Sequence, residues 1–169
     1  MVRDAIAPSS ELRLLDAAGG TGVLREACSP CGFYSFDLVM ERVKNVRASD
    51  PDAGAFVGDV TRLAAADKCF DRVLATGLFH HLDDEQSILA VEEFHRVLKD
   101  DGRVVVLDAI WPINSLNLFG YMMRKMDEGK YVRNEEPLKD ILLTKFKPVQ
   151  AGKFSSRWLD YTLMVLEKR

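Results

Sequence analysis

Short β-rich runs alternate with segments of helical periodicity over the first two thirds of the chain, and this alternation most constrains the fold. The pattern is typical of an α/β domain, in which helices join the strands of a parallel sheet. The expected strands are residues 13–16, 32–36, 55–57, 72–75 and 104–107. The expected helices before the last of these strands are residues 23–28, 38–48 and 85–98, and a turn at residues 100–102 leads into the fifth strand.

The helix at residues 85–98 has the clearest periodicity. Ile88, Val91 and His95 lie on one side of it, together with Leu98, and we expect this side to face the core. His95 is accordingly interpreted as a core histidine. An aspartate just before the helix, at position 83 or 84, is expected to cap its free N–H groups.

The last third of the chain has a different pattern. Apolar residues at 116, 119, 122, 123 and 126 predict a helix whose methionines fill the core, and Asn134 is expected to cap a second helix that runs to residue 143. Two β-rich runs follow, at residues 148–151 and 158–166, and residues 152–157 are too few for a parallel crossover of about a dozen residues. The two runs should therefore pair antiparallel. We expect one α/β domain, residues 1–169, with a three-layer, doubly wound, mostly parallel sheet and a reversed last strand.

Composition excludes several classes of protein. The chain has 169 residues, 23 Lys and Arg against 26 Asp and Glu, and a formal net charge of −3. This slight acidity and the lack of a basic stripe argue against a nucleic-acid partner. No apolar run approaches the ~20 residues of a membrane span, and the first residues do not resemble a secretory signal. A soluble, cytoplasmic protein is the expectation.

The three cysteines have two interpretations. Cys28 and Cys31 have the spacing of a zinc or redox pair, but neither Cys69 nor the histidines supply a matching second pair. Reduced, buried thiols are the favoured interpretation, and no metal site is predicted.

Polar residues stand at the ends of the predicted strands, where an open parallel sheet binds its ligands. The glycines at 19, 20 and 22 follow the first strand and allow a ligand to approach the backbone and a helix N-terminus closely. Asp37 follows Asp16 by about the 20 residues expected of a ribose-binding acid. Together these features predict an adenosine-type ligand. The residues at the five strand ends are Asp16, Asp37, Asp59, Thr76 and Asp108.

Five sequence blocks, taken in order, carry more information than any one of them alone. They are Leu14-Leu-Asp-Ala-Ala-Gly-Gly-Thr-Gly22, Phe36-Asp37, Gly58-Asp-Val60, residues 69–84 with Leu78-Phe-His-His-Leu-Asp-Asp84, and residues 93–108. In order and spacing the blocks resemble the motifs of class I S-adenosylmethionine-dependent methyltransferases, whose first motif is usually written L-D-x-G-x-G-T-G. The resemblance runs from about Arg13 to Ala109. It implies a Rossmann-like methyltransferase fold, in which the last strand is also reversed.

The resemblance implies how the glycine loop would bind S-adenosylmethionine. Asp16 would hold the loop and, through water, the methionine end of the cofactor. The backbone of Ala18 and Gly20 would face the methionyl amine and the sulfonium, and Gly22 would complete the loop. Ala18 stands where the first glycine of the motif usually lies, so its methyl group is added beside the cofactor.

The remaining cofactor-binding positions follow the later strands. By the same resemblance, Asp37 would accept hydrogen bonds from both ribose hydroxyls, in a bidentate, charge-assisted arrangement. Asp59 and the N–H of Val60 would recognise the edge of the adenine. The backbone of Thr76 and Gly77 would line the methionine portion near the reacting methyl group. For each acid taken singly, a turn or capping role is the alternative.

The chain begins about a dozen residues before the first predicted strand. Members of this family usually carry N-terminal helices that cover the cofactor and part of the acceptor pocket. A cover supplied by a partner chain or by self-association is therefore one expectation.

The implied reaction is attack by an acceptor atom on the sulfonium methyl group. Alignment of the acceptor with the methyl group in a water-poor pocket supplies most of the rate enhancement. A hydroxyl acceptor would also benefit from a base. His80 and His81 follow the fourth strand and are the candidates for this base. The alternative is that one caps the following helix and the other packs, so no catalytic residue is assigned.

Two groups of residues are candidates for the acceptor pocket. Phe79, Trp111 and Tyr121 either line the pocket or belong to the core. The segment 127–133 lies between the two late helices, and its Lys130, Tyr131 and Arg133 either hold an anionic or sugar-like acceptor or form a solvated loop.

The function predicted from the sequence is transfer of a methyl group from S-adenosylmethionine to a small-molecule acceptor. One alternative is a non-catalytic S-adenosylmethionine-binding module that acts with a partner chain. Another is a nicotinamide-dependent oxidoreductase, but the segment after Gly22 lacks the third glycine of the G-x-G-x-x-G fingerprint.

Overall fold

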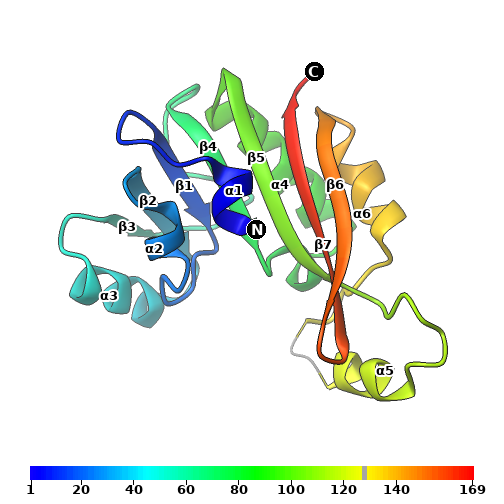
Figure 1. Ribbon diagram of the computed structural model, residues 1–169. Coiled ribbons are helices and arrows are strands. Elements are labelled where there is room, and N and C mark those ends of the chain that lie inside the picture. The colour runs from blue at the N-terminus through cyan, green and yellow to red at the C-terminus, as the bar shows by residue number, and fades with distance from the viewer. Residues whose placement is uncertain (127–128) are drawn as a thin grey trace.

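The computed structural model describes residues 1–126 and 129–169. These residues form a seven-stranded sheet with the order β3-β2-β1-β4-β5-β7-β6 (Figure 1). Strands β1 to β5 are parallel, whereas β7 runs antiparallel to its neighbours β5 and β6. The predicted α/β fold with a reversed last strand is confirmed. The strands are β1 (Arg13–Ala17), β2 (Gly32–Asp37), β3 (Gly54–Val57), β4 (Phe70–Thr76), β5 (Leu98–Ile110), β6 (Phe146–Ser156) and β7 (Leu159–Lys168).

Helices cover both faces of the sheet and complete the three predicted layers (Figure 1). One face carries α1 (Val2–Ile6), α2 (Arg25–Cys28) and α3 (Met40–Ser49), and the other carries α4 (Asp84–Val97) and α6 (Glu135–Leu142). The short 3-10 helix η1 (Phe79–His81) and helix α5 (Leu118–Lys125) belong to connections at the carboxyl ends of β4 and β5. Sequence periodicity predicts neither α1 nor η1, because each is about one turn long.

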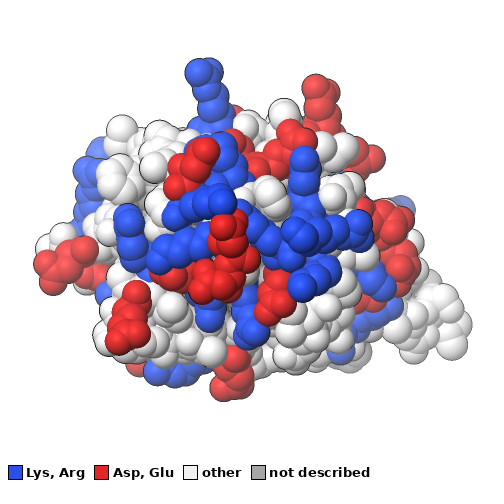
Figure 2. Space-filling model, turned by 90° about the horizontal axis from the view of Figure 1, so that it is seen from above, with Lys and Arg blue, Asp and Glu red and all other residues white. Residues whose placement is uncertain are grey.

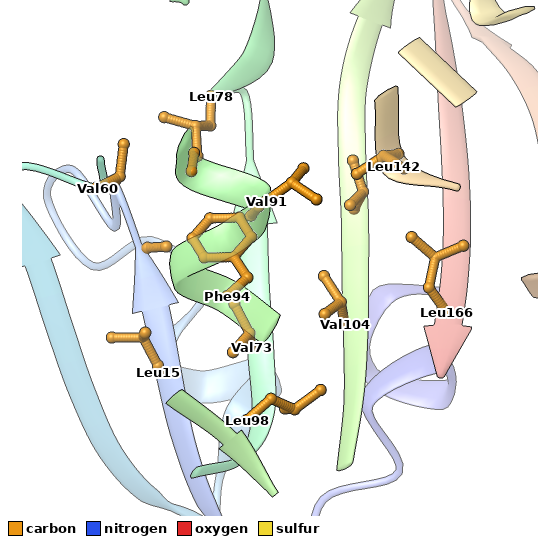
Figure 3. Packing of buried hydrophobic residues seen from close by; sticks show 14 of the residues in the cluster. Leu15, Val60, Val73, Leu78, Val91, Phe94, Leu98, Val104, Leu142 and Leu166 are labelled. Carbon is orange, nitrogen blue, oxygen red and sulfur yellow. The ribbon is translucent and has the colours of Figure 1, made fainter. Parts of the chain in front are cut away.

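Successive residues of the central strands point to opposite helical layers, so these strands are apolar on both sides. In β5, Val104 and Val106 pack in the cluster under α4 and α6, whereas Val105 packs in the cluster under α1, α2 and α3. Figure 3 shows the first cluster, in which Val91 and Phe94 of α4 lie over the sheet. Burial on both faces is the reason that the strands could be predicted from short continuous apolar runs.

Helix α4 begins as predicted, and its buried face overlaps the predicted one only in part. The Asp83 side chain accepts a hydrogen bond from the N–H of Gln86 at 2.8 Å, which confirms the predicted aspartate cap. Ile88 is 44% exposed, and the buried stripe instead runs through the alanine, valine and phenylalanine positions 90, 91, 94 and 97. Of the predicted side, Val91 and Leu98 are buried in the core cluster and His95 is half-buried, so the prediction is wrong at Ile88. Leu98 belongs to β5 rather than to the helix.

Two other predicted boundaries are corrected. Helix α2 begins at Arg25 rather than at residue 23, because the N–H of Arg25 closes a turn onto the carbonyl of Gly22 and leaves Val23 83% exposed. The predicted turn at residues 100–102 lies inside β5. There Leu98 pairs with Phe70 and Arg103 pairs with Arg72, so residues 99–102 bulge out of the ladder.

The hairpin of β6 and β7 confirms the antiparallel pairing, and its strands are longer than predicted. Helix α5 does not fill the core, however. Met122, Met123 and Met126 are 49%, 39% and 75% exposed, so the prediction that they are core residues is wrong. Helix α5 lies beyond the carboxyl end of β5, beside the turn of the hairpin, where no layer covers it in the described part of the chain (Figure 1).

The Cys28–Cys31 spacing is that of a metal or redox pair, and the structure shows how these cysteines lie. All three cysteines are free thiols, and burial raises the pKa of Cys28 to about 12, which leaves its thiol unreactive. Within residues 1–126 and 129–169 no group of three metal-ligating side chains converges. None of the helices described there combines the length and apolarity that crossing a bilayer requires.

Charge is mixed at the edge of the sheet where β1, β4 and β5 begin. Figure 2 shows this edge, on which basic and acidic side chains alternate. Lys99 pairs with Asp71 at 2.7 Å, and Arg103 pairs with Glu167 at 2.9 Å. The edge therefore does not present a field of one sign.

Candidate active site

The strand order reverses between β1 and β4, and the carboxyl ends of these two strands frame the expected ligand site. A pocket of about 420 Å³ opens there. It collects five residues that the sequence analysis assigns to the cofactor: Ala18, Asp37, Asp59, Val60 and Gly77. The carboxyl edge thus brings together residues from four separate segments of the chain.

The glycine loop after β1 is held onto the end of β2. The N–H groups of Ala18 and Gly19 donate to the carbonyl of Phe36, and the N–H of Gly20 donates to the Asp37 carboxylate at 3.0 Å. The carbonyls of Ala18 and Gly20 accept no hydrogen bond from the described residues. Ala18 has a φ of 64°, so an alanine occupies a left-handed conformation that a glycine adopts without strain.

Unpaired polar atoms lie under this loop. Oδ1 of Asp16 and Oγ of Ser35 are buried and have no hydrogen-bond partner among the described residues. A Cβ on Gly19 would lie 2.4 Å from the Ser35 hydroxyl and 2.7 Å from Oδ2 of Asp16, so only glycine allows the loop to rest on these groups. Burial, with a smaller contribution from the charge of Asp37, raises the pKa of Asp16 to about 7. Ser35 was missed by the sequence analysis, since a serine within a strand carries no motif signal.

Asp37 is 3% exposed and already anchors the loop. Its Oδ2 accepts from Gly20, its Oδ1 accepts from the N–H of Val39 at 2.9 Å, and Arg42 lies 3.6 Å away. A carboxylate oxygen has two lone pairs, so each oxygen retains one acceptor position for a ligand. Its bidentate role toward a ribose stays a prediction.

Asp59 caps a turn, and its role toward an adenine stays a prediction. Its Oδ1 caps a turn by accepting from the N–H and the hydroxyl of Thr61, at 2.9 and 2.8 Å. Its Oδ2 and the N–H of Val60 have no partner within the described chain, and both residues line the pocket. The turn therefore leaves an acceptor and a donor side by side.

A second hollow, of about 290 Å³, meets the first at Gly77. Its lining includes Thr76, His80 and Asp108, with Arg124 of α5 and Tyr161 of β7. The hydroxyl of Thr76 is buried and lacks a partner in the described structure. Of the remaining predicted cofactor residues, Asp16, Gly20 and Gly22 line neither hollow, and Gly22 faces Val46 of α3 instead.

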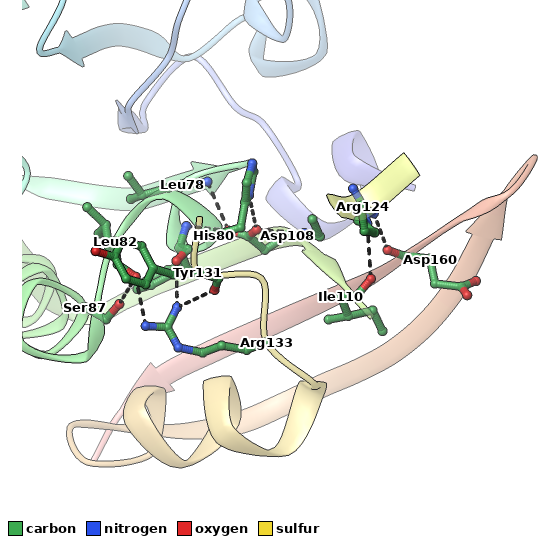
Figure 4. Close-up of polar contacts among 12 residues, drawn as sticks. Leu78, His80, Leu82, Ser87, Asp108, Ile110, Arg124, Tyr131, Arg133 and Asp160 are labelled. Atoms are coloured by element: carbon green, nitrogen blue, oxygen red, sulfur yellow. Dashed lines mark hydrogen bonds and ion pairs between the residues drawn. The ribbon is translucent and has the colours of Figure 1, made fainter. Parts of the chain in front are cut away.

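Asp108 and His80 form a buried pair that the sequence analysis did not connect. Asp108 is 1% exposed, and its carboxylate accepts from the N–H groups of Leu78, Phe79 and Ala109 at 3.0, 2.6 and 2.7 Å. Nδ1 of His80 lies 2.6 Å from Oδ1 of Asp108. Figure 4 marks this contact between the two side chains. The available signal was the adjacency of two parallel strands, which brings the segment after β4 beside the end of β5.

His81 and His95 have separate surroundings. The ring of His81 lies 4.1 Å from that of His80, and its side chain lines the first pocket. Neither His80 nor His81 caps helix α4, because Asp83 does so. The alternative interpretation, in which one of these two histidines is the cap, is wrong in that part. His95 is half-buried, its ring lies 5.9 Å from that of Phe146, and burial lowers its pKa.

Arg133 connects the segment before α6 to η1. Its guanidinium donates to the carbonyls of Phe79 and Leu82, each at 2.8 Å, and pairs with Asp84 at 2.7 Å. Figure 4 shows Arg133 bonded to Leu82. This clamp, rather than an acceptor ligand or a solvated side chain, is its role in the structure. Lys130 and Tyr131 are exposed, and residues 127 and 128 of the same predicted segment lie outside the described residues.

Of the aromatic candidates, Phe79 is buried, whereas Trp111 and Tyr121 are half-buried. Phe79 is 1% exposed and packs edge-on against Phe94, so it belongs to the core. Trp111 stacks on Tyr121 with ring centroids 5.7 Å apart. Neither of this pair lines the two hollows at Gly77.

Known proteins resemble this chain in sequence and in fold. The family described as methyltransferase domain matches residues 15–106. A demethylmenaquinone methyltransferase from Renibacterium salmoninarum is 31% identical over 114 residues, which are 66% of this chain and 47% of that protein. The YcgJ protein of Bacillus subtilis has a TM-score of 0.80 at 17% identity and covers 99% of this chain and 97% of its own. A SAM-dependent methyltransferase from Methanosarcina mazei has a TM-score of 0.78 at 16% identity, covering 95% of this chain and 93% of its own.

The two kinds of likeness carry different weight. The structural neighbours share too little sequence to show more than the fold. The chain spans about half the length of the curated relatives it matches. The family match covers more than half of the chain and includes the strand ends that frame the first pocket. The chain therefore belongs to the methyltransferase domain family.

Proposed function

We propose that this chain binds S-adenosylmethionine at the carboxyl edge of its sheet and transfers the methyl group to a small-molecule acceptor. The observation that carries the proposal is the meeting of two hollows at Gly77. One hollow has the acids Asp37 and Asp59, which suit the donors of a nucleoside, and the other has His80 and Asp108. A ligand that spans both would have its adenosine in the first and its reacting group at their junction.

The polar groups of the site fit this cofactor. Asp37 would accept from the ribose hydroxyls, and Asp59 with the N–H of Val60 would pair with the adenine. The free carbonyls of Ala18 and Gly20 suit the methionyl ammonium, since they are acceptors without a partner in the described chain. When bound, the cofactor supplies an electrophilic methyl group on a sulfonium.

The residues of the chain contribute alignment and exclusion of water. The backbone around Gly77 would hold the reacting end, and Leu78 and Leu82 would keep the first pocket apolar on one side. Holding two reactants in a near-attack geometry lowers a barrier by about 7–11 kcal/mol. This step needs no charged residue unless the acceptor must lose a proton.

An apolar acceptor agrees with the surface around α5, the helix that supplies Arg124 to the second hollow. A hollow of about 740 Å³ between α5 and the β6–β7 turn is lined by Leu116, Leu118, Phe119 and Trp158 among others, all largely exposed. Demethylmenaquinol, the reduced and hydroxyl-bearing form of the quinone named for the curated relatives, is the acceptor that we would test first. Cover by a partner chain or a second copy stays a prediction, as does a cytoplasmic location.

Calorimetry with S-adenosylhomocysteine tests the cofactor. We expect binding by the wild-type chain and a loss of affinity of about tenfold to a hundredfold in Asp37→Asn, from a charge-assisted hydrogen bond of about 1.5–3 kcal/mol. Asp52→Asn, in an exposed turn, is the matched control and should bind normally. Failure of the wild-type chain to bind would refute the proposal.

A methyl-transfer assay separates the alternative functions. Release of S-adenosylhomocysteine in the presence of demethylmenaquinol or an acceptor pool would exclude a non-catalytic module. A thermal-shift comparison of NAD with S-adenosylmethionine tests the oxidoreductase alternative, which requires the larger shift from NAD.

A further inference from the structure

We infer that His80, oriented by Asp108, is the proton acceptor for a hydroxyl group of the methyl acceptor. The inference rests on the proposed function and specifies the acceptor atom as oxygen. It depends on three properties of the pair: a fixed ring, a free nitrogen, and a position where the two hollows meet.

The carboxylate of Asp108 determines which nitrogen of His80 carries the proton. Asp108 is buried and accepts three backbone N–H groups, which hold its two oxygens in place. An ionised carboxylate only accepts hydrogen bonds, so Nδ1 of His80, 2.6 Å away, must donate. The neutral imidazole then has its lone pair on Nε2.

The free nitrogen belongs to the part of the ring that faces the hollow. A Cβ on Gly77 would lie 3.4 Å from Cε1 of His80, and one on Gly129 would lie 2.0 Å from its Cδ2. The ring is therefore held between these glycines, and Nε2 is the atom between Cε1 and Cδ2. Nε2 has no hydrogen-bond partner in the described chain, and the side chain is 11% exposed. Gly77 also borders the first pocket, where the cofactor is proposed to lie.

The reaction transfers one methyl group to the acceptor oxygen and one proton to His80. As the acceptor oxygen forms its bond to the methyl carbon, its O–H bond breaks and the proton passes to Nε2. The electron pair of the broken carbon–sulfur bond stays on sulfur, and His80 later releases the proton to water. An amine attacks through a lone pair and a thiol has a pKa of about 8.5, so a hydroxyl gains most from a base.

Other charged groups surround the ring. The buried guanidinium of Arg124 lines the same hollow as His80 and Asp108, and its charge favours an anionic oxygen there. Arg124 donates to the carbonyl of Asp160 at 2.6 Å and lies over the ring of Tyr161. Among the described residues, other titratable or charged side chains on adjoining segments include those of His81, Tyr131, Arg133 and Tyr161.

Nitrogen-15 NMR of the imidazoles tests the orientation without any turnover. The chain has only three histidines, so His80 can be assigned with single His→Gln variants. We expect neutral His80 to carry its proton on Nδ1. In Asp108→Asn the amide oxygen should stay on the N–H groups of Leu78 and Phe79, which turns the NH₂ toward Nδ1. The NH₂ cannot accept from Nδ1, and the ring proton should move to Nε2. A proton on Nε2 in the wild-type chain, or identical ring shifts in a folded Asp108→Asn variant, would overturn the inference.

Kinetics with three isosteric acceptors, 2-naphthol, 2-naphthylamine and 2-naphthalenethiol, test the chemistry. His80→Asn should lower kcat for the naphthol by about 10²–10⁴-fold and change kcat for the thiol by less than about threefold. His95→Asn is the matched control, because His95 lines neither hollow. Equal losses for all three acceptors, or no loss for the naphthol, would contradict the role.

Binding of S-adenosylhomocysteine separates this inference from the proposed function. His80→Asn should bind it with the wild-type affinity, since the imidazole is assigned to the acceptor and not to the cofactor. If the wild-type chain binds no S-adenosylhomocysteine, the proposed function fails. If it binds and the tautomer is wrong, only the inference about His80 fails.

Discussion

Replacing Asp16 by Asn should change how the stability of the chain depends on pH. Asp16 is 2% exposed, and burial together with Asp37 raises its pKa to about 7, from an ordinary value of 3.8. The folded chain therefore binds this proton more tightly than the unfolded chain. The stabilisation is complete below pH 3.8 and is lost as the pH rises through about 7.

The two pKa values set the size of the effect. At about 1.36 kcal/mol per pH unit, the interval from 3.8 to about 7 corresponds to about 4 kcal/mol of unfolding free energy. Asparagine is nearly isosteric and carries no charge at any pH. Relative to the wild-type chain, Asp16→Asn should gain about 4 kcal/mol in stability between pH 4 and pH 8.

Urea denaturation at half-unit pH steps measures this difference directly. Other carboxylates, such as Asp71 and Glu93 with their lowered pKa values, are common to both chains and cancel in the comparison. Asp52→Asn is the control and should follow the wild-type curve. Parallel curves for Asp16→Asn and the wild-type chain would refute the argument that a buried carboxyl is held neutral under the glycine loop.

Three further predictions concern the loop, helix α5 and the clamp. Gly19→Ala should displace the loop and weaken S-adenosylhomocysteine binding at least about tenfold by calorimetry, whereas Gly152→Ala, where a Cβ meets open space, should not. Met126→Ser should change the unfolding free energy by less than about 0.5 kcal/mol, while Met164→Ser, at a site 1% exposed, should cost about 2–5 kcal/mol; equal losses would restore Met126 to the core. Arg133→Ala should lower stability by about 2–3 kcal/mol through loss of its charged hydrogen bonds, and an unchanged melting temperature would exclude the clamp.

The sequence alone was sufficient for the sheet and for much of the first pocket. The central strands are apolar on both faces, so short runs such as 104–107 locate them without tertiary information. The short connection after β6 left only an antiparallel pairing to β7. Asp37 and Asp59 converge because the carboxyl ends of parallel strands meet at one edge.

The exposure of α5 was decided by the tertiary structure. Apolar residues at helical spacing have the same pattern whether a layer covers them or not, and the methionines of α5 were therefore misassigned to the core. The same limit applied to α4, where the period was right and the buried face overlapped the predicted one only in part. Periodicity specifies that a face exists, but only the packed layers specify what lies against it.

The pairing of His80 with Asp108 also required the folded chain. The two residues are 28 positions apart, and each belongs to a segment that the sequence does place at the carboxyl edge. Their contact depends on β4 and β5 being neighbours and on a one-turn helix that aims the imidazole at the carboxylate. Local propensities and strand patterns act over a few residues, whereas the geometry of a proton-transfer pair is set to a fraction of an ångström by contacts between distant segments.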